Sequence, residues 1–205
     1  MNKSKIEWTE KSWNPMVGCT KISPGCKHCY AESMARRLQG IGVKGYENGF
    51  ELTLMPNRLE EPIKVKKPTK FFVNSMSDLF HEDVPFEYID KVFSTIRNTP
   101  RHVYQILTKR ADVMANYFDK NNCPENAWLG VSVENIKHGK PRIDYLRKIP
   151  AKIKFISAEP LLEDLGELDF TNIDWVIVGG ESGNKARPMK KEWVLEIRNK
   201  CIKSN

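Results

Sequence analysis

The sequence predicts an α/β fold in which six strand–helix units form an open, partial (β/α) barrel with parallel strands. Short apolar runs alternate along the chain with segments of helical spacing, which implies right-handed crossovers between parallel strands. The runs "VIVGG" and "FISAE" fit the apolar character of strands that are buried on both faces. Polar side chains follow each strand, as in barrels whose carboxyl-edge loops build the site, whereas a doubly wound sheet gathers them at one switch point.

The elements are expected in the following order. The first unit has a strand in "SWNPMVG" (12–18) and a helix in "AESMARRLQ" (31–39). Residues 38–62 are glycine-rich and then mixed, and we interpret them as an excursion with a small hairpin. The other strands are predicted at 69–76, 102–109, 127–133, 153–159 and 174–180. Helices are predicted at 85–99, 111–120, 142–149 and 190–203, with a short helical turn or loop at 160–165. In the helix at 85–99, one face carries Phe86, Ile89, Val92, Phe93 and Ile96.

Length and composition predict a single domain over residues 1–205, because 205 residues suffice for one sizeable core and no linker interrupts them. No apolar run is long enough to cross a bilayer, and the N-terminus lacks the apolar core of a signal peptide. We therefore expect a cytoplasmic protein with no membrane partner. The formal net charge of +7 would attract nucleic acid or another polyanion, although a merely soluble basic protein has the same composition.

Three of the five cysteines lie close together, at Cys19, Cys26 and Cys29, in the pattern C-x6-C-x2-C. Cytoplasmic thiols stay reduced, so clustered cysteines indicate metal binding or catalysis more than disulfides. Structural zinc normally takes four protein ligands, and His28 would strain the loop if it reached the same ion. An iron–sulfur cube held by three cysteines leaves one iron open for an external ligand. Both metals remain candidates, and the iron–sulfur cluster is favoured.

The stretch "IEWTEKSWNPMVGCTKISPGCKHCYAE" resembles the start of the phage Gp37/Gp68-like proteins (DUF5131), a family of radical S-adenosylmethionine-like (radical SAM-like) proteins. Later blocks match in the same order: "FVNSMSDLFHEDVP", "YQILTKR", "WLGVSVEN", "FISAEPLL" and "WVIVGGESGNKARPM". The resemblance runs from about Ile6 to Met189, which is nearly the whole chain. A phage-encoded protein of this kind would act in the host cytoplasm.

The resemblance implies a radical SAM-like, partial (β/α)6 TIM-like barrel with a [4Fe–4S] cluster on Cys19, Cys26 and Cys29. S-adenosylmethionine would chelate the open iron, and an electron from the cluster would break a carbon–sulfur bond to release a 5′-deoxyadenosyl radical. The usual motif is C-x3-C-x2-C with an aromatic residue before the last cysteine; here the first gap is longer and His28 takes the aromatic position. Related proteins continue into a further strand, and without it one barrel side would stay open for a large substrate or a partner.

Two strand ends are assigned to the cofactor from the resemblance. Ser75 and Asp78 follow the strand after the cluster unit, where radical enzymes approach the amino group of S-adenosylmethionine. A carboxylate there would accept a charge-assisted hydrogen bond, although both residues are also good caps of loops and helices. Either Lys109 or Arg110 could pair with the cofactor carboxylate or a substrate phosphate, and a solvated surface pair is the alternative.

Acidic and hydroxyl groups end two further strands. Glu134 could reach the ribose hydroxyls of the cofactor, and Ser157 is assigned to the same site. Glu159 could act on either substrate or cofactor, and it is one of two candidate catalytic residues. Because carboxylates inside a barrel mouth are costly unless they are paired, structural ion pairs are the alternative for both glutamates.

The last strand is followed by "GGESG". Gly179 and Gly180 would let the backbone approach a flat ligand such as adenine, and Glu181 could bind a hydroxyl group, although many turns have this composition. Arg187 could face an anionic substrate and is the second candidate catalytic residue.

The leading hypothesis is a radical SAM-like iron–sulfur enzyme that cleaves S-adenosylmethionine reductively and modifies an unknown substrate, with nucleic acid as one candidate. Such an enzyme would need an electron donor as a partner. One alternative is a phage-encoded binding or anti-host-defence protein that keeps the fold and binds a host protein or RNA without turnover. A second alternative is a zinc-stabilised nucleic-acid-binding module.

Overall fold

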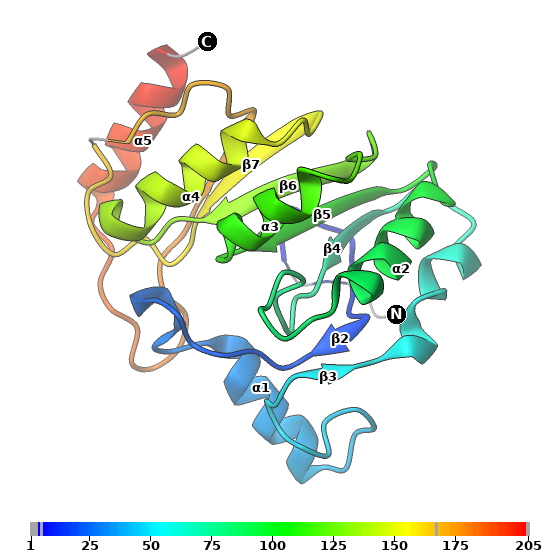
Figure 1. The fold of residues 1–205 in the computed structure, drawn as a ribbon. Coiled ribbons are helices and arrows are strands. Elements are labelled where there is room, and N and C mark those ends of the chain that lie inside the picture. Colours follow the sequence, from blue (N-terminus) through cyan, green and yellow to red (C-terminus); the bar gives the residue numbers. More distant parts are fainter. Residues whose placement is uncertain (1–3, 5, 167, 204–205) are drawn as a thin grey trace.

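The computed structural model describes residues 4, 6–166 and 168–203, and its centre is a six-stranded parallel sheet (Figure 1). The strands lie in the order β1-β4-β5-β6-β7-β8, and each pairs in parallel with its neighbours. Their bounds are β1 Lys11–Trp13, β4 Lys70–Val73, β5 Val103–Thr108, β6 Ala127–Ser132, β7 Ile153–Ala158 and β8 Trp175–Val178. Because this order follows the chain without reversal, the sheet has no switch point. The predicted α/β class and partial barrel are confirmed.

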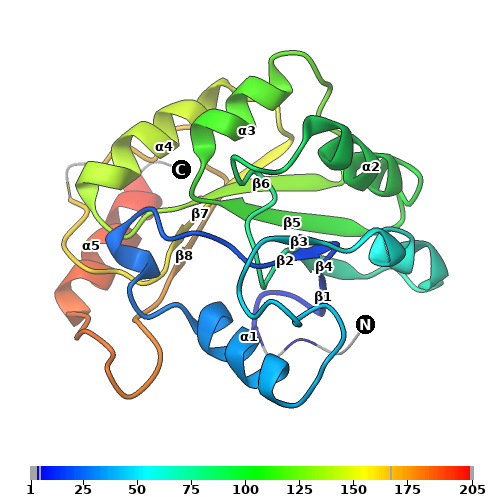
Figure 2. The ribbon, with the colours of Figure 1, turned by 60° about the horizontal axis from the view of Figure 1, so that its bottom comes forward.

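Three helices cover one face of the sheet: α2 Phe86–Arg97, α3 Ala111–Phe118 and α4 Ile136–Lys148 (Figure 2). Their apolar faces form the main core with the sheet. Four of the five residues predicted to share a face of α2 are fully buried, whereas Phe86 in the first turn stays 38% exposed against the ring of Tyr117. Helix α5 Lys191–Lys203 lies beyond β8. Among the described residues, no helix has both the length and the apolar character that crossing a membrane requires.

Helix α4 begins six residues before the predicted start at residue 142. The side chain of Asn135 caps it by accepting a hydrogen bond from the backbone N–H of His138 at 3.0 Å. Pro141 lies inside the helix, where a proline removes a backbone hydrogen bond. The cap and the buried residues Ile143 and Leu146 therefore outweigh the cost of the proline.

The strand predicted over residues 12–18 divides into two strands of different sheets. After β1 the chain turns at Asn14–Pro15, and β2 Met16–Val17 pairs antiparallel with β3 Thr53–Leu54. The excursion over 38–62 therefore pairs back to the start of the chain instead of forming a hairpin of its own. Helix α1 Tyr30–Gly40 packs on this small sheet through a second apolar cluster, which contains Val17, Ala31, Ala35, Tyr46 and Met76.

Aromatic rings fill the face of the sheet opposite the three helices, near the amino ends of the strands. Trp8 lies in edge-to-face contact with Phe72 of β4, with ring centroids 4.8 Å apart, and with Trp175 of β8 at 6.0 Å. Phe155 of β7 joins the same cluster, at 5.6 Å from Trp175. The side-chain amide of Gln105 donates to the carbonyl of Trp8 at 3.1 Å and holds the N-terminal segment in place. The opposite, carboxyl end of the barrel carries the polar groups.

Candidate functional site

The cysteine loop, which we define as residues 18–29, follows β2 and leads into α1. It contains a short 3-10 helix, Pro24–Cys26. Two backbone bonds anchor its start: Gly18 N–H donates to the carbonyl of Met76 at 3.0 Å, and Cys19 N–H to that of Phe50 at 3.1 Å. Gly18 has φ +83°, and a Cβ there would lie 2.1 Å from the carbonyl oxygen of Glu51, so this position requires glycine.

The cysteines of the loop are free, half-buried thiols. Cys19 Sγ accepts a hydrogen bond from Arg110 Nη1 at 3.6 Å, and Cys26 Sγ lies 3.8 Å from Ser23 Oγ. Cys29 is the N-cap residue of α1. Burial and the negative charge of Asp78 raise the pKa of Cys19 to about 11, against the opposing effect of Arg110, so a metal must displace a proton from this thiol.

The described part of the chain contains no cluster of three or more His, Cys, Asp or Glu side chains that are close enough together to hold a metal ion. The donor chemistry nevertheless suits an iron–sulfur cluster. The thiols come from one loop, the described residues hold no disulfide between them, and Cys26 acts electrostatically on Cys19.

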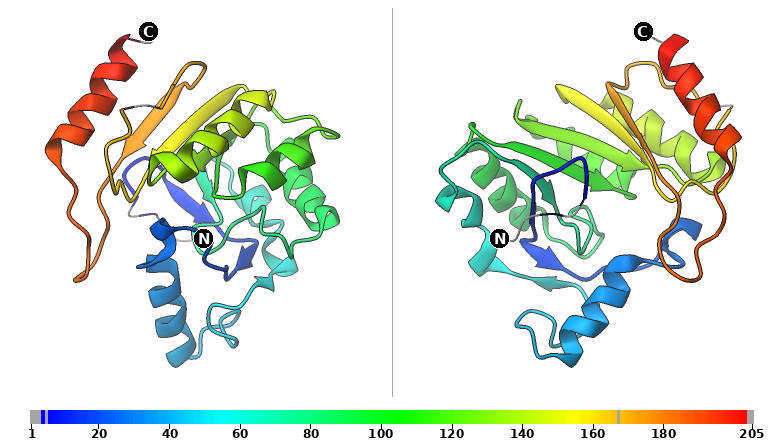
Figure 3. Two further views of the ribbon diagram at one scale, coloured as in Figure 1. Left: turned by 60° about the vertical axis from the view of Figure 1, so that its left-hand side comes forward. Right: turned by 180° about the vertical axis from the view of Figure 1, so that it is seen from behind.

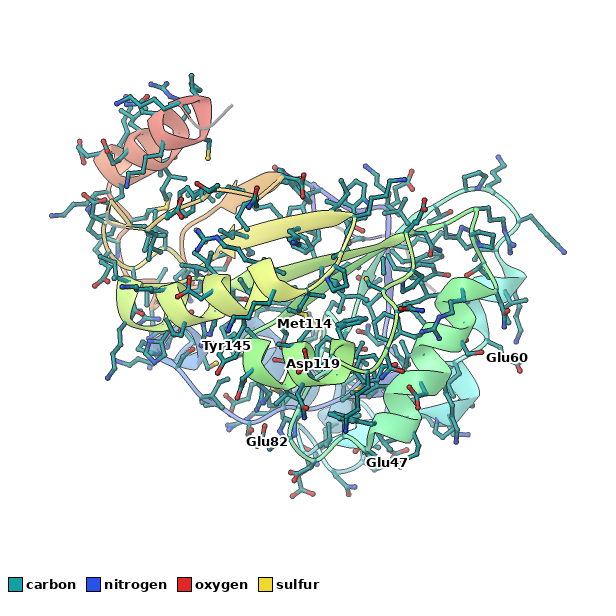
Figure 4. The ribbon with its side chains drawn as sticks, turned by 45° about the horizontal axis from the view of Figure 1, so that its top comes forward. Glu47, Glu60, Glu82, Met114, Asp119 and Tyr145 are labelled. Carbon is teal, nitrogen blue, oxygen red and sulfur yellow. The ribbon has the colours of Figure 1, made fainter. Side chains whose placement is uncertain are left out.

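Arg110 organises the start of the cysteine loop. It is only 5% exposed, although it is charged. Besides Cys19, its guanidinium contacts Asp78 Oδ2 at 3.2 Å and donates to Thr20 Oγ1 at 2.7 Å, and its Nε donates to Glu82. Figure 4 labels Glu82, which lies in the segment between β4 and α2. A single buried cation therefore ties the loop to the ends of β4 and β5.

His81 completes this network as a neutral side chain. Its Nδ1 accepts from the backbone N–H of Asp83 at 3.2 Å, so its Nε2 carries the proton and donates to Thr20 Oγ1 at 2.9 Å. Burial, together with the positive charge of Arg110, lowers the pKa of His81 and is consistent with this form. The Thr20 hydroxyl in turn donates to Glu82 Oε1 at 3.2 Å.

Asp78 is buried, and its oxygens are engaged by the protein. Oδ1 accepts from Thr108 Oγ1 at 2.6 Å and from the N–H of Phe80 at 3.1 Å, and Oδ2 accepts from the N–H of Lys109 and from Arg110. The carboxylate therefore holds strand ends together through Arg110.

Ser75 lies nearby and is paired with the side-chain amide of Asn14, whose Nδ2 is 3.1 Å from Ser75 Oγ. The carbonyl of Ser75 accepts a hydrogen bond from the Tyr30 hydroxyl.

Glu134 lies at the end of β6 and is completely buried. Its Oε2 accepts from Arg142 Nη1 of α4 at 2.7 Å, whereas Oε1 has no hydrogen-bond partner among the described residues. It packs against the cysteine loop, since a Cβ on Gly25 would lie 3.2 Å from its Cδ. Burial opposes ionisation of Glu134, but the charge of Arg142, the nearby Ser23 side chain and the charge of Lys109 outweigh it, and the pKa is lowered.

Glu159 bridges the ends of β7 and β8. Its Oε2 accepts from Ser157 Oγ at 2.9 Å. On the other side, a Cβ on Gly179 would lie 2.5 Å from Glu159 Oε1, so the lack of a side chain at Gly179 leaves room for the carboxylate in this position. The next residue, Gly180, lies near Met189.

Arg187 and Glu181 form a pair that reaches the cysteine loop. Arg187 Nε donates to Glu181 Oε2 at 3.0 Å, and Nη2 donates both to Glu181 Oε1 and to the carbonyl of Pro24 at 2.9 Å. The hydrogen bonds from Arg187 lower the pKa of Glu181 to about 2. Figure 3 shows the segment between β8 and α5 descending beside the start of α1. This pair holds the two segments together.

The structure thus gathers most of the predicted residues at the carboxyl end of the sheet, in two groups around the cysteine loop. Asp78, with Arg110, lies beside Cys19, and Glu134 and Arg187 lie beside Gly25 and Pro24. Among the described residues, Glu159 and Ser157 make no hydrogen bond to the loop, and Lys109 acts on Glu134 through its charge.

Several residues of the site have roles that were not assigned from the sequence. Arg110 was expected to pair with a cofactor carboxylate or a substrate phosphate, whereas it is buried and pairs with Asp78. Arg142 and Thr20 follow no motif that marks them. Asn74 could have been found, since it directly follows β4: it is buried, has φ +61°, and neither side-chain amide atom has a hydrogen-bond partner among the described residues.

Comparison with known proteins identifies both a family and a fold. A family model described as "Protein of unknown function (DUF5131)" matches residues 3–205. No curated protein matches the chain. Among solved structures, spore photoproduct lyase complexed with dinucleoside spore photoproduct has a TM-score of 0.59 at 14% identity, over 98% of this chain and 63% of that chain.

A double mutant of spore photoproduct lyase with bound AdoMet and dinucleoside spore photoproduct has a TM-score of 0.58 at 13% identity, over 98% of this chain and 63% of that one. The chain thus spans about 63% of the length of these structures. At this identity the likeness shows the fold alone, which is a partial, TIM-like (β/α) barrel.

Proposed function

The chain belongs to the DUF5131 family, and from this membership, its radical SAM-like fold and its cysteine loop we propose a radical SAM-like iron–sulfur enzyme. In this proposal Cys19, Cys26 and Cys29 hold a [4Fe–4S] cluster, and the protein cleaves S-adenosylmethionine reductively to modify a substrate. The observation that supports it most is the position of these free thiols on the loop after the first barrel strand, at the carboxyl end of the sheet. A neighbour of the same fold is a complex with AdoMet.

The polar groups of the barrel mouth would receive the cofactor. Glu134 Oε1 and the amide of Asn74 are buried and have no hydrogen-bond partner in the part of the chain that the structure describes, whereas buried polar atoms are normally hydrogen-bonded. They would bind hydroxyl or amino groups of S-adenosylmethionine. Asp78 and Glu181 would act indirectly, by holding Arg110 and Arg187 against the cysteine loop.

When bound, a cluster with three cysteine ligands supplies an open iron for S-adenosylmethionine and one electron that breaks its carbon–sulfur bond, with methionine as the leaving group. The chain's own residues orient the loop and exclude water. Arg110 fixes Cys19, Gly25 brings the loop onto Glu134, and the aromatic cluster around Trp8 closes the amino end of the barrel. Glu159 and Arg187 stay the candidates for contact with the substrate.

Anaerobic reconstitution with iron and sulfide tests the proposal. The wild-type chain should take up about four iron and four labile sulfide and turn brown. On reduction with dithionite it should release 5′-deoxyadenosine and methionine from S-adenosylmethionine in equal amounts. Cys26→Ala should lose both properties, whereas Cys201→Ala on α5, the matched control, should keep both.

Three outcomes would contradict the proposal, and the first two would each favour a different function. Stoichiometric zinc without bound sulfide would favour the zinc-stabilised module. A cluster without release of 5′-deoxyadenosine would favour a binding protein that keeps the fold without turnover. Equal iron content in wild type and Cys26→Ala would exclude the cysteine loop as the ligand set.

A further inference from the structure

A groove opens beside the cysteine loop, between α1 and the segment that follows β8. Its volume is about 520 Å³. One wall carries Lys27, Tyr30, Met34 and Arg37, and the other includes Lys185. Cys29 also lines the groove, so its inner end reaches the candidate cluster site.

The groove contains a rigid, exposed aromatic ring. Tyr30 is 54% exposed, yet its hydroxyl donates to the carbonyl of Ser75 at 2.5 Å. The ring is therefore held in one place while much of its surface remains open. Met34 follows one turn later on α1 and is 43% exposed, which extends the apolar surface along the helix.

Cations surround this ring. Lys27, Arg37 and Lys185 are exposed, and no acidic side chain among the described residues forms a salt bridge with any of them. The one glutamate of the groove, Glu32, is neutralised by Lys21 at 2.7 Å and by Arg36 at 2.7 Å. The groove thus has an excess of positive charge.

We propose that this groove binds single-stranded nucleic acid, with a base stacked on Tyr30 and phosphates at Arg37, Lys27 and Lys185. Proteins that hold single strands combine an aromatic platform with a cationic track in this way. Tyr30 and Arg37 lie about 10 Å apart along the helix axis, which suits a short strand that crosses the groove. The assignment of this strand as the substrate rests on the proposed function; the binding itself does not.

An acidic peptide would satisfy the cations but would leave the fixed ring without a stacking partner. A duplex hides the faces of its bases, so Tyr30 could not stack on them. A single strand satisfies both the ring and the cations, and for this reason we favour it.

Fluorescence anisotropy with a labelled 20-mer tests the proposal, in parallel with single-stranded DNA, single-stranded RNA and duplex DNA. The protein carries Cys26→Ala, so that binding is measured without a cluster. We expect at least one single strand to bind more tightly than the duplex. The double variant Arg37→Glu/Lys185→Glu should bind at least about tenfold more weakly and show a smaller salt slope.

Tyr30→Ala should weaken binding by about 5- to 150-fold without changing the salt slope, since stacking is worth about 1–3 kcal/mol per base. Tyr30→Phe should retain most of the affinity because it keeps the ring. The matched charge control is Lys66→Glu/Lys67→Glu, which changes two exposed lysines far from α1 in sequence. Because the proposed phosphate contacts lie in the groove, this variant should bind within about twofold of wild type.

Equal losses in the two charge-reversal variants would overturn the groove as the site, and so would tighter binding of the duplex or no binding at all. Because these measurements need no cluster, their failure would leave the release of 5′-deoxyadenosine untouched. Conversely, a protein that binds single strands but releases no 5′-deoxyadenosine would refute the proposed enzymatic function and leave the proposed binding groove intact.

Discussion

Arg110 is the buried cation on which the start of the cysteine loop depends. It contacts Cys19, Thr20 and Asp78 while it is 5% exposed. Arg110→Met should lower the free energy of unfolding by about 3–5 kcal/mol, because Asp78 would remain charged and buried without its partner. Urea denaturation of the metal-free protein measures this.

The control is Arg36→Met, which removes an exposed arginine from its pair with Glu32 and should cost less than about 1 kcal/mol. The double variant Asp78→Asn/Arg110→Met should recover part of the loss. If Arg110→Met and Arg36→Met lower the free energy of unfolding by the same amount, Arg110 does not hold the loop in the way that its contacts indicate.

Glu134 should make the stability depend on pH. Its folded pKa is lowered: burial opposes ionisation, but Arg142, Ser23 and Lys109 together outweigh it. The ionised carboxylate therefore stabilises the fold above its unfolded pKa of about 4.3, and this contribution is lost as the pH falls through the folded pKa. The difference in unfolding free energy between wild type and Glu134→Gln should be constant near neutrality and shrink below about pH 4.

Glu196→Gln, an exposed change on α5, serves as the control for this titration and should show no such trend. A difference for Glu134→Gln that grows toward acid would mean that its folded pKa is raised, contrary to the contacts.

At the scale of residues, the sequence could predict which side chains lie at strand ends but not how they are engaged. Asp78 and Glu181 were assigned to the cofactor, and both are occupied by arginines of the protein. Lys109 and Arg110 are adjacent, and only the turn into α3 decides that Arg110 is the buried one. Which of two adjacent residues is buried depends on the direction of their side chains, and the order of residues in the sequence does not give this direction.

At the scale of elements, Gly18 decides where the cysteine loop begins. Gly18→Ala should destabilise the chain more than Gly42→Ala, although both glycines have positive φ, because only Gly18 has backbone within 4 Å of the added methyl group. We expect Gly18→Ala to lower the free energy of unfolding by about 1–3 kcal/mol more than Gly42→Ala, because the control variant is destabilised only by its left-handed backbone conformation. Thermal unfolding measures the difference, and equal costs would mean that the contact with Glu51 is not tight.

The strands and most helices were predictable, because each buried strand and each amphipathic helix repeats its own period. The errors came from competing local signals. The start of α4 was predicted six residues late, because the side-chain cap at Asn135 was not recognised. The strand predicted over 12–18 divides because Pro15 lacks an N–H and the chain turns toward β3. Pairing of β2 with the distant β3 could not be read from either segment alone.

At the scale of the whole molecule, the partial barrel was predictable from the recurrence of polar residues after every strand. A doubly wound sheet would have required a reversal of strand order, and there is none. The groove beside α1 was not predictable, because it is formed by segments far apart in the chain, around Tyr30 and Lys185. Net charge alone indicated an anionic partner but not where it would bind.

The ring cluster around Trp8 also bears on how the chain is synthesised. Each sheet strand pairs with the next one along the sequence, so a polypeptide that leaves the ribosome can add them one by one. Trp8 emerges long before Trp175, and the two rings lie in edge-to-face contact in the folded protein. Until Trp175 has been synthesised, the indole of Trp8 lacks this contact. The nascent chain would be most exposed to chaperones and to aggregation during that interval.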